Sequence, residues 1–319
     1  MKKILVCGAG GFIGTHLVTF LKKQGYYVIG ADIKHPEYGK TSAYEFYIVD
    51  LTNLIEVEKL FEQRFYEVYQ LAADMGGAGY LFTGKNDAKV MSNSALINLN
   101  ILNSMLKYQV NRIFFSSSAC VYNTSNQISA DNVITKEESA YPAEPDSEYG
   151  WEKLFSERLF LAYARNFNLH VRIARLHGIF GTLGAYNNGK EKSVAAICRK
   201  IAQNTEEIEV WNPGIQSRSY LYVDECVLGI YKIMNNSYGF PLNLGSTESI
   251  TLNNLVSKIS KIANKKIKIK YIDGPIGVMH RNSDNELIKK VLNWSPAETL
   301  DKGLKETYYW IEEQIKKIN

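Results

Sequence analysis

The first half of the chain alternates short apolar runs with longer segments in which apolar residues recur every three or four positions. Apolar runs at 3–7, 27–31, 45–49, 68–72, 112–116 and 169–174 are too short for helices and predict buried strands. Segments 12–24, 93–108 and 148–167 have helical periodicity and predict helices between these strands. This order is typical of an α/β fold with a doubly wound parallel sheet, the Rossmann architecture.

The pattern changes after residue 175. Residues 178–189 are rich in glycine and asparagine and predict a loop. Helices at 193–202, 222–234, 252–263 and 300–318 and strands at 208–211 and 267–271 predict a smaller α/β lobe, with helix 222–234 returning to the first domain. The expected division is a first domain of residues 1–175 plus about 215–238, and a smaller C-terminal lobe of about 176–214 plus 239–319. We expect a ligand to bind between them.

Composition narrows the classes of function. The 319 residues are 45% hydrophobic, which is enough for a sizeable core, and the net charge of +4 is too small to indicate a nucleic-acid partner. No apolar run is long enough to span a membrane, and the short N-terminal run is not a signal peptide. The four cysteines show neither disulfide nor metal-ligand spacing, so we expect no metal, and a reducing, cytoplasmic location.

Gly8, Gly11 and Gly14 follow the first strand and open the first helix. Glycines permit a tight turn and a close approach of the backbone to a pyrophosphate, which the helix N-terminus attracts. The spacing departs from Gly-x-Gly-x-x-Gly because Ile13 stands where the third glycine is expected. A dinucleotide site that includes Phe12 and Ile13 is therefore predicted, with a plain glycine-rich turn as the alternative.

Acidic and small residues at the ends of later strands extend this site. Asp32 ends the second strand, where a carboxylate can bind the ribose 2′-hydroxyl and repel a 2′-phosphate, which favours NAD over NADP. Asp50 ends the third strand and either meets the adenine or shapes a turn. Leu71, Ala72 and Ala73 follow the fourth strand and are expected beside the cofactor.

Tyr149 and Lys153 are spaced Tyr-x-x-x-Lys, which puts a phenol and an ammonium on one face of a helix. The ammonium is expected to lower the pKa of the phenol. The tyrosine can then take a proton from an alcohol while a nicotinamide takes the hydride. Ser118 and Cys120 follow the fifth strand and are expected in the same site.

Together these motifs resemble the extended short-chain dehydrogenase/reductase family, whose members mostly act on nucleotide sugars. The residues that carry the resemblance are Gly8-x-x-Gly11-x-x-Gly14, Asp32, Asn93, Ser118 and Tyr149-x-x-x-Lys153. Segments 72–77, 117–122, 142–145, 189–192 and 281–285 resemble, more narrowly, the members that act on C3 and C5 of GDP-mannose. The resemblance runs nearly end to end and implies an NAD-binding first domain and a nucleotide-sugar-binding second lobe.

The resemblance also implies a reaction. Oxidation of the C4 hydroxyl to a ketone would acidify the hydrogens on C3 and C5, and Cys120 and Lys192 would be the base and the acid that exchange them. A thiol near a cation can have a depressed pKa. From the residues alone, a single cysteine after a strand is usually a small buried hydrophobe, and Lys192, in a run of charged residues, is typical of a solvated surface lysine. Ser118 would bind the substrate hydroxyl or Tyr149, or cap a strand end.

The resemblance places further residues at the substrate. The backbone of Met75, Gly76 and Gly77 would wrap the sugar or phosphate, and Gln216, Arg218 and Arg281 would bind the diphosphate, because guanidinium groups match phosphate oxygens. The alternative for the arginines is a surface ion pair with Asp224 or Asp284.

Two departures leave the sugar and the inverted carbons open. Gly178 stands where the family has an asparagine that touches the nucleotide sugar, so an amide contact is lost and space is expected to open; Tyr186 replaces a tryptophan. A 5-epimerase on a different sugar, a 4-epimerase, a 4,6-dehydratase and a catalytically silent NAD or nucleotide-sugar binder remain alternatives. Family analogy implies a homodimer that pairs helices 93–108 and 148–167 with their copies.

Overall fold

The computed structural model describes residues 1–129, 135–203, 206–211, 213–274 and 277–318. Its main sheet has seven parallel strands in the order β11-β6-β5-β4-β1-β2-β3. The strands are β1 (Lys3–Cys7), β2 (Tyr27–Asp32), β3 (Glu45–Ile48), β4 (Glu67–Gln70), β5 (Arg112–Ser118), β6 (His170–Leu176) and β11 (Leu242–Leu244). The order reverses between β1 and β4, which confirms the doubly wound fold.

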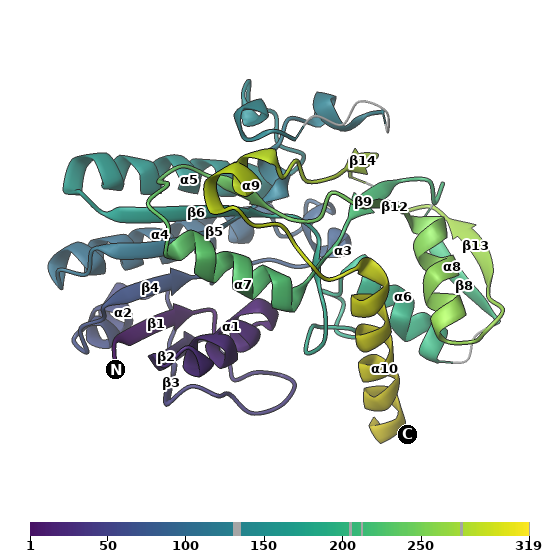
Figure 1. Ribbon diagram of the computed structural model, residues 1–319, viewed down its shortest axis with the longest axis horizontal. Helices are drawn as coiled ribbons and strands as arrows, with labels where there is room; N and C mark the ends of the chain where they lie inside the picture. Colours follow the sequence, from purple (N-terminus) through teal and green to yellow (C-terminus); the bar gives the residue numbers. More distant parts are fainter. Residues whose placement is uncertain (130–134, 204–205, 212, 275–276, 319) are drawn as a thin grey trace.

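Helices cover both faces of this sheet (Figure 1). Side chains alternate along β1: Ile4 and Val6 face α1 (Phe12–Lys23) and α7 (Val223–Met234), whereas Leu5 and Cys7 face the opposite layer. That layer consists of α2 (Leu54–Phe61), α4 (Asp87–Lys107) and α5 (Glu148–Phe167). Because both faces are buried, β1 and β2 are nearly continuous apolar runs instead of alternating with polar residues.

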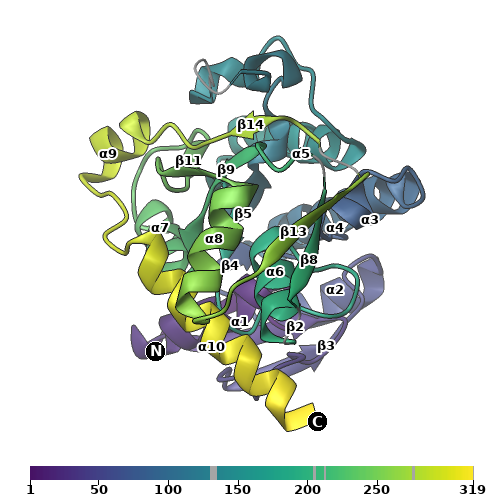
Figure 2. The ribbon, with the colours of Figure 1, turned by 90° about the vertical axis from the view of Figure 1, so that its right-hand side faces the viewer.

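The second lobe is built on a pair of parallel strands, β8 (Glu207–Trp211) and β13 (Lys268–Ile272). Helices α6 (Ser193–Ala202), α8 (Leu252–Ile262) and α10 (Leu300–Ile318) pack against one another beside it (Figure 2). These elements agree with the predicted ones to within a residue or two. The expected helix at 93–108 begins earlier, at Asp87.

Short elements were missed by the pattern, since two to seven residues carry no recognisable period. They are α3 (Ala78–Leu81), β7 (Ile179–Phe180), β9 (Ser217–Ser219), β10 (Leu221–Tyr222), β12 (Ser249–Thr251), β14 (His280–Arg281), α9 (Glu286–Leu292) and the 3-10 helices η1 (Ala119–Val121), η2 (Thr124–Gln127) and η4 (Glu137–Ala140). Of these, η1, β9 and β14 bring residues to the site described below.

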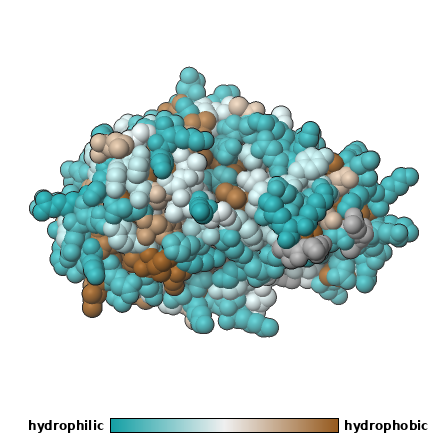
Figure 3. All heavy atoms as spheres, turned by 90° about the horizontal axis from the view of Figure 1, so that it is seen from below, coloured by the Kyte–Doolittle hydropathy of each residue, from teal (hydrophilic) through white to brown (hydrophobic). Residues whose placement is uncertain are grey.

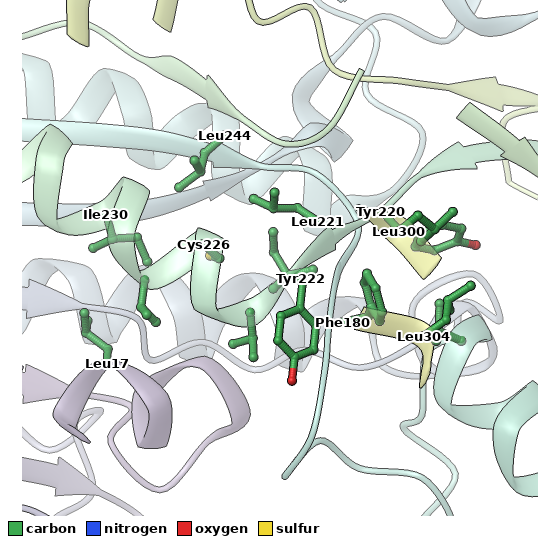
Figure 4. Packing of buried hydrophobic residues seen from close by; sticks show 14 of the residues in the cluster. Leu17, Phe180, Tyr220, Leu221, Tyr222, Cys226, Ile230, Leu244, Leu300 and Leu304 are labelled. Atoms are coloured by element: carbon green, nitrogen blue, oxygen red, sulfur yellow. The ribbon is translucent and has the colours of Figure 1, made fainter. Parts of the chain in front are cut away.

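The two lobes share one hydrophobic core. Figure 4 shows Leu17, Ile230 and Leu244 from the main sheet layer in one cluster with Phe180 and, from the second lobe, Leu300. Strand β11 belongs to the main sheet, although it lies within the range 239–319 that we expected in the second lobe. The remaining division into a cofactor domain and a substrate lobe stays a prediction.

The surface is mostly polar where Figure 3 shows it, with hydrophobic residues in a few small patches. Within the described residues, every helix is too short or too polar to cross a bilayer.

Candidate active site

The glycine-rich turn between β1 and α1 is held by contacts that exclude a side chain. Gly8 has φ +81°, and a Cβ there would lie 2.8 Å from the backbone nitrogen of Ala72. A Cβ on Gly14 would lie 2.0 Å from the carbonyl oxygen of Gly8. Gly11 is the N-cap of α1 and no side chain caps it. The first N–H groups of this helix, at Phe12 and Ile13, are therefore suited to an anion such as a pyrophosphate.

Asp32 stands at the end of β2 with its carboxylate beside this turn. Its Oδ2 accepts a hydrogen bond from the N–H of Gly10 at 2.9 Å, and its Oδ1 accepts one from the N–H of Lys34 at 3.2 Å. Burial raises the pKa of Asp32, and the two N–H groups oppose that rise. Each oxygen keeps a free lone pair, so the carboxylate can still accept bonds from ribose hydroxyls.

The other predicted cofactor residues surround the same turn. Leu71, Ala72 and Ala73 follow β4, and Ala72 lies against Gly8. The carboxylate of Asp50 accepts hydrogen bonds from the N–H and the hydroxyl of Thr52 at 2.9 and 2.7 Å. Asp50 therefore has the turn role, and its contact with adenine stays a prediction.

Tyr149 and Lys153 are both buried on α5. The Lys153 ammonium donates to the carbonyl of Ser116 at 3.1 Å and lies 5.6 Å from the centre of the Tyr149 ring. Burial lowers the pKa of Lys153, and the charges of Glu152 and Glu157 oppose that shift.

We expected the Tyr149 pKa to be lowered, but the protein groups around it raise it. Burial raises the pKa of Tyr149, and the charges of Cys120 and Glu152 raise it further, while a hydrogen bond with Ser118 acts the other way. A phenolate at this place needs an additional positive charge, which the oxidised nicotinamide ring of NAD carries when bound.

Cys120 lies in the 3-10 helix η1 that directly follows β5. The Ser118 hydroxyl caps this turn and accepts the N–H of Cys120 at 3.2 Å. Gly150 allows α5 to approach, because a Cβ there would lie 2.3 Å from the carbonyl oxygen of Cys120. The cation beside the thiol is Arg281, whose Nη1 donates to the sulfur at 3.3 Å.

The pKa of the Cys120 thiol is raised, whereas we expected a lowered one. Burial raises the pKa of Cys120, as does the charge of Asp146, and Arg281 offsets only part of the rise. A group that holds its proton at rest can become a base only when a neighbouring positive charge stabilises its thiolate.

Lys192 is the N-cap residue of α6, as the expected loop-to-helix boundary requires. Its side chain is exposed, yet protein surrounds the ammonium closely enough for burial to lower its pKa. The charge of Cys120 opposes this shift, so sulfur and ammonium lie within electrostatic range of each other. The predicted base in η1 and the predicted acid at the start of α6 are thus near enough for their charges to interact.

The segment 75–77 lies against the segment that precedes Lys192. Met75 packs in a small cluster with Tyr149 and Cys120. The N–H of Gly77 donates to the carbonyl of Lys190 at 3.0 Å, and a Cβ on Gly77 would lie 2.3 Å from that of Glu191. A Cβ on Gly76 would lie 2.7 Å from the side chain of Tyr80. These glycines allow the two loops to meet beside the reacting residues.

Asn93, within α4, holds the same loop. Its side-chain amide donates to the carboxylate of Asp74 at 3.0 Å, and the Tyr80 hydroxyl donates to the other oxygen of that carboxylate at 2.9 Å. The Asp74 carboxylate also lies 3.9 Å from the Lys190 ammonium. Asn93 therefore acts on the site through Asp74.

The predicted diphosphate residues converge on β9 and β14. Arg218 donates to the carbonyls of Ser217 and Val278 at 2.7 and 2.6 Å, and burial together with the charge of Arg281 lowers its pKa to about 10. Gln216 donates to the carbonyl of Trp211 at 3.0 Å, and its buried Oε1 has no partner among the described residues.

The alternative ion pairs expected for the arginines are wrong. Arg281 pairs with Asp146 at 2.7 Å instead of Asp284. Asp224 lies 3.6 Å from His16, and Arg218 donates to backbone carbonyls.

The structure changes the interpretation of Gly178 and Tyr186, the two residues that depart from the family. Gly178 has φ +53°, and a Cβ there would lie 2.1 Å from the carbonyl oxygen of Ser219. The backbone of Ser219 thus fills the space that we expected to open. Tyr186 is buried with its ring 5.3 Å from that of Tyr38 and 5.8 Å from that of Trp310. It is a core residue.

Sequence reasoning missed several buried polar residues around the reacting groups. Asp146 binds Arg281, and Glu152 lies 4.0 Å from the Lys153 ammonium. Asn98 donates to Glu152 at 3.2 Å. Asp146 and Glu152 stand next to the Tyr-x-x-x-Lys motif, which was the one available signal, but their partners come from distant segments. Across the described residues, no three His, Cys, Asp or Glu side chains gather as a metal site.

Comparisons with known proteins agree with this geometry. The NAD dependent epimerase/dehydratase family matches residues 4–245. The chain is 40% identical over 317 residues to the GDP-mannose 3,5-epimerase of Arabidopsis thaliana, covering 99% of this chain and 83% of the relative. It is also 40% identical over 320 residues to GDP-mannose 3,5-epimerase 1 of Oryza sativa subsp. indica, with the same coverage.

A solved structure is similar over nearly the whole fold. The UDP-glucose 4-epimerase of Thermotoga maritima superposes with a TM-score of 0.88 and 25% identity, covering 98% of this chain and 99% of that one.

Proposed function

Because the chain belongs to the NAD dependent epimerase/dehydratase family, we propose that it is a GDP-mannose 3,5-epimerase. NAD is its cofactor and a nucleotide sugar its substrate. The observation that carries the proposal is the packing of Cys120 in η1 beside Tyr149 in α5, with Lys192 at the start of α6 within electrostatic range of the thiol. A 4-epimerase needs no such base and acid beside its tyrosine, and a 4,6-dehydratase is expected to carry an acidic pair where this chain has Ala119 and Cys120.

The glycine turn and Asp32 would hold the dinucleotide. The uncapped start of α1 offers N–H groups to the pyrophosphate, and the carboxylate of Asp32 accepts the ribose hydroxyls. When bound, NAD accepts a hydride from the sugar and later returns it. Tyr149 takes the proton of the C4 hydroxyl, and Lys153, fixed by the Ser116 carbonyl, stabilises the phenolate.

Cys120 and Lys192 act on the ketone that follows. A C4 ketone acidifies the hydrogens on C3 and C5, because the carbanion is delocalised as an enolate. The thiolate of Cys120 removes one of these hydrogens as a proton, and the Lys192 ammonium donates a proton to the opposite face. The lowered pKa of Lys192 suits this step, since a weaker hold on the proton makes a better acid.

The nucleotide would lie toward β9 and β14. Arg218 and Arg281 supply two guanidinium groups close to each other, and Gln127 and Asp146 line a cavity of about 320 Å³ beside them. The donors of Arg281 are directed at Gln127, Cys120 and Asp146, and those of Arg218 include bonds to the carbonyls of Ser217 and Val278. Either arginine would exchange protein contacts for a diphosphate. Specificity for GDP rests on the similarity to the plant enzymes.

The proposal is tested with a panel of GDP- and UDP-sugars in deuterated water. Solvent deuterium should enter C3, C5 or both carbons of GDP-mannose, and epimers should appear without added NAD if the cofactor stays bound. A 4-epimerase would return its own hydride and leave the product unlabelled. Turnover of a UDP-sugar with no label, or no turnover of any sugar, would refute the proposal.

Two variants separate the steps. Cys120→Ala should lose solvent exchange while substrate still reduces bound NAD, whereas Tyr149→Phe should lose both reactions. Undiminished exchange in Cys120→Ala would remove the thiol from the mechanism.

We also propose a homodimer built on α4 and α5. These helices pack against each other and expose Met91, Leu96, Trp151 and Phe155. Trp151 and Phe155 stand one turn apart on α5, and exposed apolar side chains of this size favour a partner surface. Sedimentation of the purified chain measures the assembly directly. The free thiols are compatible with the expected cytoplasmic location, which stays a proposal.

A further inference from the structure

Arg281 binds three different side chains with its three nitrogen atoms. Its Nε donates to Oε1 of Gln127 at 2.6 Å, its Nη1 to the sulfur of Cys120 at 3.3 Å and its Nη2 to Oδ2 of Asp146 at 2.7 Å. A guanidinium is planar and its donors diverge at fixed angles, so three partners define its position closely.

The two oxygen partners are themselves fixed. Gln127 is fully buried and donates to the carbonyls of Tyr122 and Asn123 at 3.3 and 3.1 Å. The Asp146 side chain is 4% exposed, and its Oδ1 accepts the hydroxyl of Ser147, the N-cap of α5, at 3.1 Å. Asp146 thus connects Arg281 to the start of the helix that carries Tyr149.

We propose that Asp146 is a positioning residue for proton transfer at Cys120: it holds the Arg281 guanidinium against the sulfur and offsets part of its charge. The proposal rests on the proposed function only for its catalytic meaning. The three contacts and the burial of Asp146 stand without it. Asp146 and Arg281 are 135 positions apart in the chain, so the fold assembles this group.

The charges around the thiol determine the direction of the effect. Arg281 on β14 favours the thiolate, and Asp146, before α5, opposes it. Lys192 at the start of α6 and Arg218 on β9 are also within electrostatic range, and the phenol of Tyr149 faces the thiol from α5. Removing only the charge of Asp146 should therefore ease ionisation of Cys120, and removing Arg281 should hinder it.

The test measures alkylation of Cys120 by iodoacetamide against pH in the full chain with bound NAD, followed by intact mass. Cys7, Cys198 and Cys226 are buried and serve as internal controls. Asp146→Asn keeps an oxygen acceptor for Arg281 and should move the midpoint to lower pH by about one unit. Arg281→Gln should move it to higher pH.

The matched control is Glu144→Gln, which removes an exposed carboxylate two residues from Asp146 and should leave the midpoint unchanged. The pH profile of deuterium entry into GDP-mannose should move with Asp146→Asn in the same direction. An unmoved or raised alkylation midpoint in Asp146→Asn would overturn the role of Asp146, even if the wild type exchanges deuterium normally. If instead the midpoints move as expected but no sugar exchanges, the proposed function fails and the role of Asp146 at the thiol is upheld.

Discussion

The backbone N–H of Gly10 donates a hydrogen bond to the Asp32 carboxylate at 2.9 Å, and this bond joins the glycine-rich turn to the end of β2. A Cβ on Gly10 would lie 2.2 Å from the carbonyl oxygen of Lys34 and 3.1 Å from Cγ of Asp32. The turn can therefore close only on a glycine here. Gly10 was not among the predicted cofactor residues, although it stands in the middle of the glycine run.

Gly10→Ala should weaken NAD binding by at least about tenfold, because the loop after β2 must move away and carry Asp32 with it. Calorimetric titration with NAD measures the change. Gly239→Ala is the matched control, since a Cβ there meets no atom within 4 Å. Equal affinities in the two variants would show that the turn tolerates the displacement.

Asp32→Ala should reduce the preference for NAD over NADP, because the carboxylate that repels a 2′-phosphate is removed. Asp32→Asn separates charge from shape: it can still accept the N–H of Gly10, so it should lose preference with less loss of NAD affinity. Dissociation constants for both dinucleotides give the ratio. A ratio equal to that of the wild type would exclude Asp32 from cofactor choice.

Gly150→Ala should lower solvent exchange at least about tenfold while NAD binding changes little. The added Cβ would lie 2.3 Å from the Cys120 carbonyl and 2.8 Å from Pro145, so η1 or α5 must shift. Displacements of this size at reacting groups cost rate steeply. Alanine has a higher helix propensity than glycine, so the substitution itself should not destabilise α5. The free energy of unfolding of the variant therefore shows whether the added Cβ strains the fold or only displaces the reacting groups. If Gly150→Ala exchanges solvent deuterium at the wild-type rate, the position of the Cys120 thiol does not limit the reaction.

His177 should make the protein less stable as the pH falls. It is buried with Nε2 2.8 Å from Oδ1 of Asn243, and burial lowers its pKa to about 3 from an ordinary value near 6.5. Below about pH 6.5 the unfolded chain binds a proton that the folded chain rejects until about pH 3. The free energy of unfolding should thus fall by roughly 1.4 kcal/mol per pH unit across this window from His177 alone.

His177→Gln removes this titration and should flatten the curve. Denaturant unfolding of both proteins at several pH values between about 7 and 4 isolates the contribution of His177 as a difference. His35→Gln, at an exposed position, should follow the wild type. Parallel curves for His177→Gln and wild type would contradict the buried, neutral imidazole.

The sequence by itself determined the features that depend on neighbours along the chain. Short apolar runs predicted every strand of the main sheet except β11, because a strand buried on both faces tends to be a continuous apolar run, and the 3.6-residue period predicted the helices between them. Gly8, Gly11 and Gly14 marked the dinucleotide turn, and the four-residue spacing of Tyr149 and Lys153 required only an α-helix.

Only the tertiary structure decided which charges surround the reacting groups. Arg281 reaches Cys120 across 161 residues, because β14 pairs with β9 beside the end of β5, and no spacing in the chain indicates that contact. The pKa shifts of Tyr149 and Cys120 also had the opposite sign to expectation. Their direction depends on burial, and burial is set by every element that packs around a group, whereas the sequence shows only the neighbour one turn away.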